Sequence, residues 1–131
     1  MNEINRGIAI LIVDDSRSMR RIVMRFLENN GFYNITEAPD GIEALEVVRT
    51  TAVDLIVSDL NMPRMDGLEF LKILKNDAKT RHIPFIMLTV EAIQKTMNKA
   101  VSLGVDSYIV KPVSEPVFID EMIRVIRRSK G

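Results

Sequence analysis

The chain has 131 residues, enough for one domain with a buried core, and its 47% hydrophobic and 27% charged content is typical of a globular protein. Its formal net charge of zero argues against generic binding to nucleic acid or to an anionic membrane surface. It has no cysteine, which excludes disulfide bonds and is compatible with a reducing compartment. The apolar run at residues 8–13 is too short for a signal sequence or a membrane span. We therefore expect one cytoplasmic domain over residues 1–131, without membrane insertion.

Short apolar runs alternate with helical patterns along the chain. Strands are predicted at residues 8–13, 32–36, 55–57, 83–88 and 108–110. Helices are predicted between residues 16 and 31, from 40 onward, over 67–75, from 93 to the stop at Gly104, and over 115–128. The apolar residues that mark these helices are Met19, Ile22, Val23, Phe26 and Leu27, which form one stripe, then Ala44, Leu45, Val47, Val48, Leu68, Leu71, Leu74, Ile93, Met97, Ala100 and Val101, and finally Val117, Phe118, Met122, Val125 and Ile126 on the inner side of the last helix.

This alternation, with connections of a few residues, requires a parallel sheet that carries helices on both faces. The predicted fold class is therefore α/β, with a doubly wound five-stranded parallel sheet. The second strand is the most polar of the five, so we expect it at a sheet edge. Because the fifth helix ends shortly before residue 131, we expect no output domain.

Polar residues that are capable of chemistry stand at the ends of four predicted strands. Asp14 and Asp15 follow the first strand, Asp59 follows the third, Thr89 ends the fourth, and Lys111 follows the fifth. The carboxyl ends of parallel strands meet at one edge of a doubly wound sheet, where such folds bind ligands. This edge is therefore predicted to collect three carboxylates, one hydroxyl and one ammonium group.

Carboxylates that lie this close together need a cation. Two of them about 4 Å apart repel each other by roughly 4 kcal/mol at an effective dielectric constant of 20. Mg²⁺ prefers one or two carboxylates together with water and phosphate oxygens, and Lys111 is suited to a phosphate oxygen. A metal, an ammonium and a hydroxyl donor around one carboxylate indicate phosphoryl transfer, with Asp59 as the nucleophile.

Each of these residues also has an ordinary structural explanation. Asp15 or Ser16 can cap the first helix, and Asp59 taken alone is a loop carboxylate. Thr89 is a common strand-end residue, and Lys111 alone is a solvated lysine. Their joint occurrence at the ends of four separate strands favours the functional interpretation over four independent structural ones.

The same residues carry a resemblance to a known family. The chain is similar to the receiver domains of two-component response regulators and, among them, to the stand-alone chemotaxis regulators. The matching positions cover nearly the whole chain and are residues 13–16, 18–23, 37–38, 40–41, 58–59, 61–63, 65–67, 89, 108 and 110–112. The resemblance implies a flavodoxin-like (βα)5 fold with strand order 2-1-3-4-5.

The resemblance also implies how the phosphoryl group is accepted. Asp59 would receive it from a phosphohistidine of a sensor histidine kinase, and Lys111 would pair with it. Mg²⁺ would be held directly by Asp15 and Asp59, by the backbone carbonyl of Asn61, and by Asp14 largely through a water molecule. The protein would then be a signalling phosphoacceptor with self-phosphorylation and autodephosphorylation chemistry only, and not an enzyme.

The output of such a protein is a change of surface. The resemblance implies that Thr89 moves toward the phosphoryl group and that Tyr108 swings inward behind it. This movement would reshape the face formed by the fourth helix, the fifth strand and the fifth helix. The implied partners are the histidine kinase, a phosphatase and a downstream effector such as a flagellar switch component, with no direct binding of nucleic acid.

The sequence departs from the stand-alone chemotaxis regulators at three positions near the site. Leu60 replaces a tryptophan, Ser16 replaces a bulkier apolar residue, and Val90 stands where a small residue is usual. The bulk of Val90 is predicted to slow the access of phosphodonor or water. Asn61 and Glu91 are further candidates for setting the phosphoryl lifetime, because their side chains are placed to reach an attacking water.

Other functions remain open from the sequence. The protein could be a phosphorelay intermediate or a regulator of another effector. It could also be a small phosphatase with an aspartyl-phosphate intermediate, although the chain shows no cap domain that would enclose a substrate. A flavin-binding module would need a phosphate-cradling loop after the first strand, and Asp14-Asp15 would repel phosphate there without a metal.

Overall fold

The computed structural model describes residues 4–130. Its elements are β1 (Ile10–Val13), α1 (Arg17–Asn29), β2 (Ile35–Ala38), α2 (Gly41–Thr50), β3 (Leu55–Ser58), α3 (Gly67–Lys75), β4 (Phe85–Thr89), α4 (Gln94–Ser102), β5 (Ser107–Val110) and α5 (Glu115–Lys130). All strand pairs are parallel, and the sheet order is β2-β1-β3-β4-β5. The predicted fold class, the strand order and the edge position of the second strand are confirmed. No helix within the described residues is long and apolar enough to cross a membrane.

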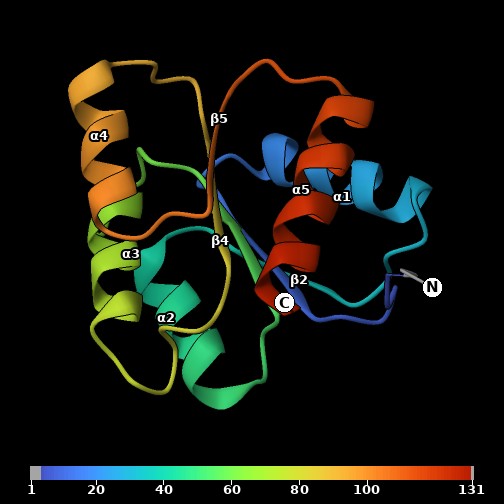
Figure 1. Ribbon diagram of the computed structural model, residues 1–131, viewed down its shortest axis with the longest axis horizontal. Helices are drawn as coiled ribbons and strands as arrows, with labels where there is room; N and C mark the ends of the chain where they lie inside the picture. The colour runs from blue at the N-terminus through green and yellow to red at the C-terminus, as the bar shows by residue number, and fades with distance from the viewer. Residues whose placement is uncertain (1–3, 131) are drawn as a thin grey trace.

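The molecule has three layers, with the sheet between two groups of helices (Figure 1). Helices α1 and α5 cover one face, and α2, α3 and α4 cover the other. Alternation along the strands supplies both cores, because Ile10 and Ile12 pack with α1 and α5 while Leu11 and Val13 pack with α2 and α3. Strands that are buried on both sides explain why the sequence shows unbroken apolar runs and no polar alternation.

The second strand lies three residues later than predicted, at Ile35–Ala38. The apolar residue that suggested the earlier start, Phe32, belongs to the end of α1. The N–H of Gly31, at φ 89°, donates to Glu28, and the N–H of Phe32 donates to Leu27 at 3.0 Å. This is the Schellman arrangement, in which an apolar residue after the glycine packs back onto the helix. Phe32 is therefore buried as part of a helix cap and not as part of a strand.

The other strands differ from the prediction by one or two residues. Strand β1 begins at Ile10, although Ile8 before it is buried in the core. Strand β4 begins after Pro84, which has no N–H for the ladder, and β5 begins one residue earlier than predicted. Hydrogen bonds to neighbouring strands, which burial alone does not reveal, decide these boundaries.

Four apolar residues of these helical patterns are exposed, and for Ile22 and Val117, which were predicted on the apolar stripe or the inner side of their helices, that prediction is wrong. They are Ile22 (45% exposed), Ile93 (58%), Val101 (65%) and Val117 (58%). Three of them stand directly beside a buried residue, namely Val23, Ala100 or Phe118. One step along a helix turns the side chain by about 100°, which carries the neighbour away from the core. Ile93 is the N-cap of α4, so it precedes the helix that it was assigned to.

Candidate functional site

Three carboxylates meet where β1 and β3 end. One carboxylate oxygen from each of Asp14, Asp15 and Asp59 lies within 4.8 Å of the others. The two strands are direct neighbours with Val13 opposite Ser58, so the residues after them emerge side by side. The N–H of Asp59 donates to the carbonyl of Val13 at 2.8 Å, which extends the ladder up to the cluster. The order of the strands therefore builds the cluster from residues 44 positions apart in the sequence.

Lys111 reaches the same cluster from the end of β5. Its Nζ lies 3.0 Å from Asp14 Oδ2 and 3.7 Å from Asp59 Oδ2. The side chains of Lys111 and Asp14 are each 9% exposed and that of Asp59 is 12% exposed, so water screens these charges weakly. The backbone N–H of Lys111 donates to the carbonyl of Thr89 at 2.8 Å, which holds the lysine beside the end of β4.

The surroundings of Asp59 change the pKa of its carboxyl group. Burial raises the pKa of Asp59, Lys111 lowers it, the negative charge of Asp14 raises it again, and the Leu60 amide and the Thr89 side chain lower it. The net effect is a raised pKa. One oxygen, Oδ1, accepts the N–H of Leu60 at 2.7 Å. A buried carboxylate that resists ionisation is stabilised by a cation beside it or by a reaction that changes its charge.

Thr89 and Tyr108 both contact Glu91, the second residue after the end of β4. Thr89 is fully buried, and its Oγ1 accepts the N–H of Glu91 at 3.3 Å. The hydroxyl of Tyr108, on β5, donates to the carbonyl of Glu91 at 2.8 Å. Partial burial raises the pKa of Tyr108, as do the charges of Glu91 and Asp59. One loop residue therefore links a hydroxyl at the acidic cluster to an aromatic side chain on the edge strand.

The loop from β3 to α3 approaches Asp59 closely. Met62 is buried, whereas Asn61 is exposed. Gly67 begins α3, and a Cβ there would lie 2.4 Å from the backbone oxygen of Asp59. Close approach, rather than a tight turn, is therefore what requires glycine at this position. Val90, which directly follows Thr89, is 69% exposed.

Two arginines make contacts that were not anticipated from the sequence. Arg20 donates to the backbone oxygen of Asp14 at 2.6 Å and to Glu37 at 3.0 Å. Arg64 donates to the buried carboxylate of Asp40 at 2.9 Å through its Nε. Each contact joins residues on different elements, and local sequence patterns contain no signal for such pairs.

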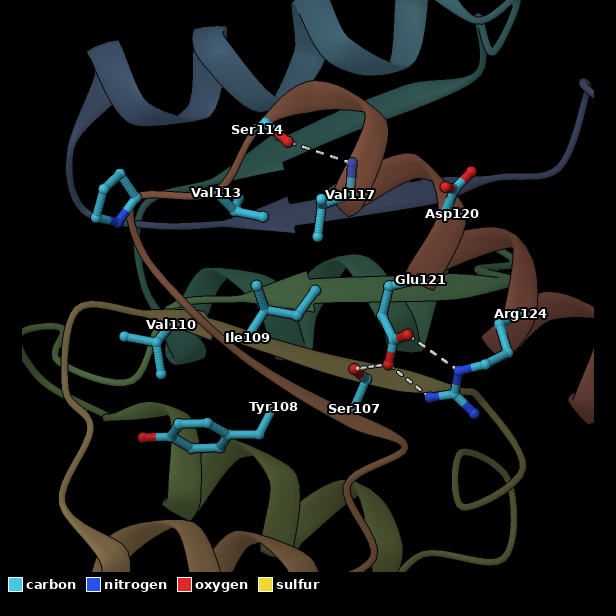
Figure 2. Close-up of a pocket in the computed structure, with 11 residues that line it drawn as sticks. Ser107, Tyr108, Ile109, Val110, Val113, Ser114, Val117, Asp120, Glu121 and Arg124 are labelled. Carbon is cyan, nitrogen blue, oxygen red and sulfur yellow. Dashed lines mark hydrogen bonds and ion pairs between the residues drawn. The ribbon is translucent and has the colours of Figure 1, made fainter.

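A groove lies beside β5 and α5 (Figure 2), and none of Asp14, Asp15, Asp59 and Lys111 is among the residues that line it. It encloses about 690 Å³ and is bordered by Tyr108 at one end. At the other end Glu121 accepts hydrogen bonds from Ser107 and Arg124, drawn as dashed lines in Figure 2. The bonds from Arg124 and Ser107 lower the pKa of Glu121 to about 2, so the carboxylate stays charged and fixes α5 to the strand.

The donor set of the cluster suits a hard divalent cation. Three carboxylates supply oxygen ligands, and Asp15 is exposed to water, which leaves room for the water ligands that Mg²⁺ retains. Lys111 neutralises only part of the charge, since its one ammonium faces two nearby carboxylates. The residues present are therefore compatible with Mg²⁺.

Known proteins are similar to this chain in sequence and in fold. The pattern of the response regulator receiver domain matches residues 10–123. Chemotaxis protein CheY-3 of Vibrio cholerae is 38% identical over 125 residues, which cover 95% of this chain and 96% of that protein. Chemotaxis protein CheY of Pseudomonas aeruginosa is 38% identical over 122 residues, which cover 93% and 98% of the two chains. A high-resolution structure of Vibrio cholerae chemotaxis protein CheY4 gives a TM-score of 0.84 at 34% identity, covering 91% of this chain and 98% of that one.

The chain therefore belongs to the response regulator receiver domain family, and its relatives make it a CheY-like receiver of the chemotaxis type. The predicted resemblance is confirmed. Receivers of this type are signalling domains rather than classical enzymes.

Proposed function

We propose that this protein is a receiver switch that accepts a phosphoryl group on Asp59, with Mg²⁺ held at the acidic cluster. The observation that carries the proposal is the convergence of Asp14, Asp15 and Asp59 within 4.8 Å, with Lys111 beside two of them. Such a cluster is costly to bury unless it serves a cation and an anionic group, because like charges repel strongly where water is scarce.

In the proposed transfer, a carboxylate oxygen of Asp59 attacks the phosphorus of a phosphohistidine on a sensor histidine kinase. A P–O bond forms as the P–N bond breaks, and the histidine nitrogen keeps the electron pair and takes up a proton from solvent. Later attack by water on the phosphorus releases inorganic phosphate and restores Asp59. Positioning and charge neutralisation supply most of the catalysis in reactions of this kind.

The residues around Asp59 would divide the work of holding the ion and the phosphoryl group. Asp15 and Asp59 would hold Mg²⁺ directly, with the backbone carbonyl of Asn61 as a further ligand and Asp14 acting through water. When bound, Mg²⁺ would neutralise charge on the carboxylates and on the phosphoryl oxygens. Lys111, whose Nζ now lies 3.7 Å from Asp59 Oδ2, would donate to a phosphoryl oxygen.

The signal would leave the site through Thr89 and Tyr108. A phosphoryl group on Asp59 offers new acceptor oxygens, and the buried hydroxyl of Thr89 is a donor close to them. Movement of Thr89 would disturb its contact with the Glu91 N–H, and the Glu91 carbonyl holds the Tyr108 hydroxyl. Tyr108 would then turn inward and reshape the groove beside β5 and α5 (Figure 2).

The partners follow from the family and from the groove. A histidine kinase would supply the phosphoryl group, and an effector would bind the α4–β5–α5 face. Both curated relatives are chemotaxis proteins, which supports a flagellar switch component as the effector. A phosphorelay intermediate would use the same chemistry with a phosphotransfer protein as the partner.

Intact-mass measurement after incubation with acetyl phosphate tests this function. With Mg²⁺ the wild-type protein is expected to gain one phosphoryl group, and without Mg²⁺ or in Asp59→Asn it should gain none. Asp54→Asn, which changes a carboxylate at the opposite end of β3, is the matched control and should behave like wild type. Equal gain in Asp59→Asn would contradict the proposal, and net turnover of an external organic phosphate substrate would favour the phosphatase alternative.

A further inference from the structure

The loop between β3 and α3 contains an unusual turn. Arg64 has φ 68°, and within residues 4–130 it is the one residue other than glycine with a positive φ. The N–H of Met65 donates to the carbonyl of Pro63 at 2.7 Å, so the chain turns through Arg64 in three residues. Side chains with a Cβ disfavour this conformation, and it persists only where the surroundings hold it.

A buried carboxylate on another element holds the turn. Asp40 is 3% exposed, and it accepts two hydrogen bonds from Arg64, at 2.9 Å from Nε and 2.5 Å from the terminal nitrogen. Asp40 is also the N-cap of α2, where its other oxygen accepts the N–H of Glu43 at 3.0 Å. Both oxygens are thus in use, so the position of the carboxylate is fixed by the helix and not by the arginine. Arg64 is therefore attached to a rigid point.

The neighbouring residues fix the ends of the same loop. The side chain of Met65 lies on Gly41, because a Cβ at Gly41 would come within 2.8 Å of its Sδ. The N–H of Gly67 donates to the carbonyl of Leu60 at 2.7 Å, which closes the loop at its base. Between these ends stands the exposed Asn61.

We propose that Arg64 is a positioning residue, whose ion pair with Asp40 holds the segment of Asn61 at the acidic cluster. This inference rests on the proposed function, because Asn61 is assigned there as a backbone ligand of Mg²⁺. It assigns to α2 a part in the phosphoacceptor site, although the described residues of α2 contribute no side chain to the acidic cluster. Loss of the ion pair would release the turn and loosen the segment that carries Asn61.

Three variants separate the ion pair from the strain. Arg64→Ala removes the pair and keeps a Cβ at a positive φ, whereas Arg64→Gly removes the pair and relieves the strain. Asp40→Asn removes the charge and keeps a side chain that caps helices equally well. Arg124→Ala is the matched control, since Arg124 pairs with Glu121 at 3.0 and 2.5 Å on the far side of the molecule.

Two readouts are needed, calorimetric titration with MgCl₂ and amide hydrogen exchange of Leu60 and Gly67 in metal-free protein. We expect all three variants to weaken Mg²⁺ binding by about 3- to 10-fold and to speed exchange at both amides, while Arg124→Ala changes neither. Asp40→Asn combined with Arg64→Ala should be no worse than Arg64→Ala alone, because Arg64→Ala already removes both ion pairs of the arginine, with Asp40 and, at 3.3 Å, with Glu43. Arg64→Gly should match Arg64→Ala in Mg²⁺ affinity while unfolding at a higher temperature.

Wild-type exchange rates and Mg²⁺ affinity in the variants would overturn the inference while leaving the proposed function intact. A wild-type protein that gains no phosphoryl group would overturn the proposed function. In that case the exchange rates still decide whether Arg64 holds the loop, and unchanged rates in Arg64→Ala would reject that too.

Discussion

The two ends of the sheet both carry aspartates, and they use them in opposite ways. At the amino end, Asp54 stands before β3 and accepts the N–H of Ala9 at 2.8 Å, while Asp106 stands before β5 and accepts the N–H of Phe85 at 2.8 Å. Each of these carboxylates completes the backbone hydrogen bonding of a neighbouring chain segment. At the carboxyl end, Asp14, Asp15 and Asp59 gather within 4.8 Å.

This difference distinguishes structural carboxylates from functional ones. Asp54 and Asp106 belong to no carboxylate cluster among the described residues, so the backbone N–H that each one accepts is sufficient to satisfy it. Carboxylates that lie close together repel one another, so they do not stabilise the fold unless a ligand binds. The aspartates at the amino end therefore stabilise the sheet, whereas those at the carboxyl end favour the binding of a cation.

The largest effect is expected from Lys111→Ala, because it removes the cation from two nearly buried carboxylates. Breaking a buried pair from one side should cost about 3 kcal/mol of unfolding free energy in metal-free protein. Added MgCl₂ should then restore more stability to the variant than it adds to wild type. Urea unfolding with and without MgCl₂ measures both quantities. If the metal-free variant were as stable as wild type, the carboxylates at the carboxyl end would not need a positive charge beside them.

At the amino end, Asp106→Ala should cost about 1–2 kcal/mol of unfolding free energy, because the buried N–H of Phe85 loses its acceptor. Mg²⁺ affinity should not change, since the change lies at the opposite end of the strands. Calorimetric titration beside urea unfolding separates the two effects. A weakened Mg²⁺ affinity would break the distinction between the two ends.

The opposite sign is expected for Asp59→Asn, which should stabilise the metal-free protein by about 1 kcal/mol at pH 7. Burial raises the pKa of Asp59 in the folded state above the ordinary value of 3.8, so its ionised form opposes folding. As the pH falls through this raised pKa, wild-type Asp59 takes up a proton and its cost disappears. The gap between the two proteins should therefore close on acidification. Thermal unfolding across pH checks it, and a gap that widens toward low pH would refute the assignment.

The smallest effect is expected from Val90→Ala. Val90 directly follows Thr89 and is 69% exposed, and removing its bulk should speed phosphorylation by acetyl phosphate several-fold without changing Mg²⁺ affinity. Intact-mass measurements on samples quenched at successive times give the rate of phosphorylation. Val101→Ala, which trims an equally exposed valine on α4, is the control. An equal or slower rate in Val90→Ala would reject the role of Val90 as a gate.

The sequence was most informative where chemistry follows directly from chain order. Asp14, Asp59, Thr89 and Lys111 each end an apolar run, and parallel strands bring such ends together, so their meeting was predictable. Their roles as metal ligands, acceptor and switch stay predictions. The strand prediction at Phe32 was wrong, because an apolar residue after a glycine gives the same local sequence pattern in a helix cap and in a strand.

Side-chain contacts between residues far apart in the sequence could not be predicted from the sequence. Arg64 and Asp40 lie 24 positions apart, and neither the capping pattern at Asp40 nor the loop around Arg64 indicates the other. The bond from Tyr108 to the Glu91 carbonyl is equally invisible, because it depends on how β5 lies against the loop after β4. Patterns with a period of a few residues report local structure, whereas side-chain pairing across elements depends on the assembled fold.

The most direct test of the central claim is to locate the phosphoryl group after incubation with acetyl phosphate and Mg²⁺. Borohydride reduces an acyl phosphate to an alcohol, so the modified aspartate becomes homoserine and can be found by peptide mass spectrometry. We expect homoserine at position 59, with Asp54 and Asp106 at the amino end unmodified. Homoserine at any other aspartate, or equal modification at both ends of the sheet, would contradict the assignment of Asp59 as the acceptor.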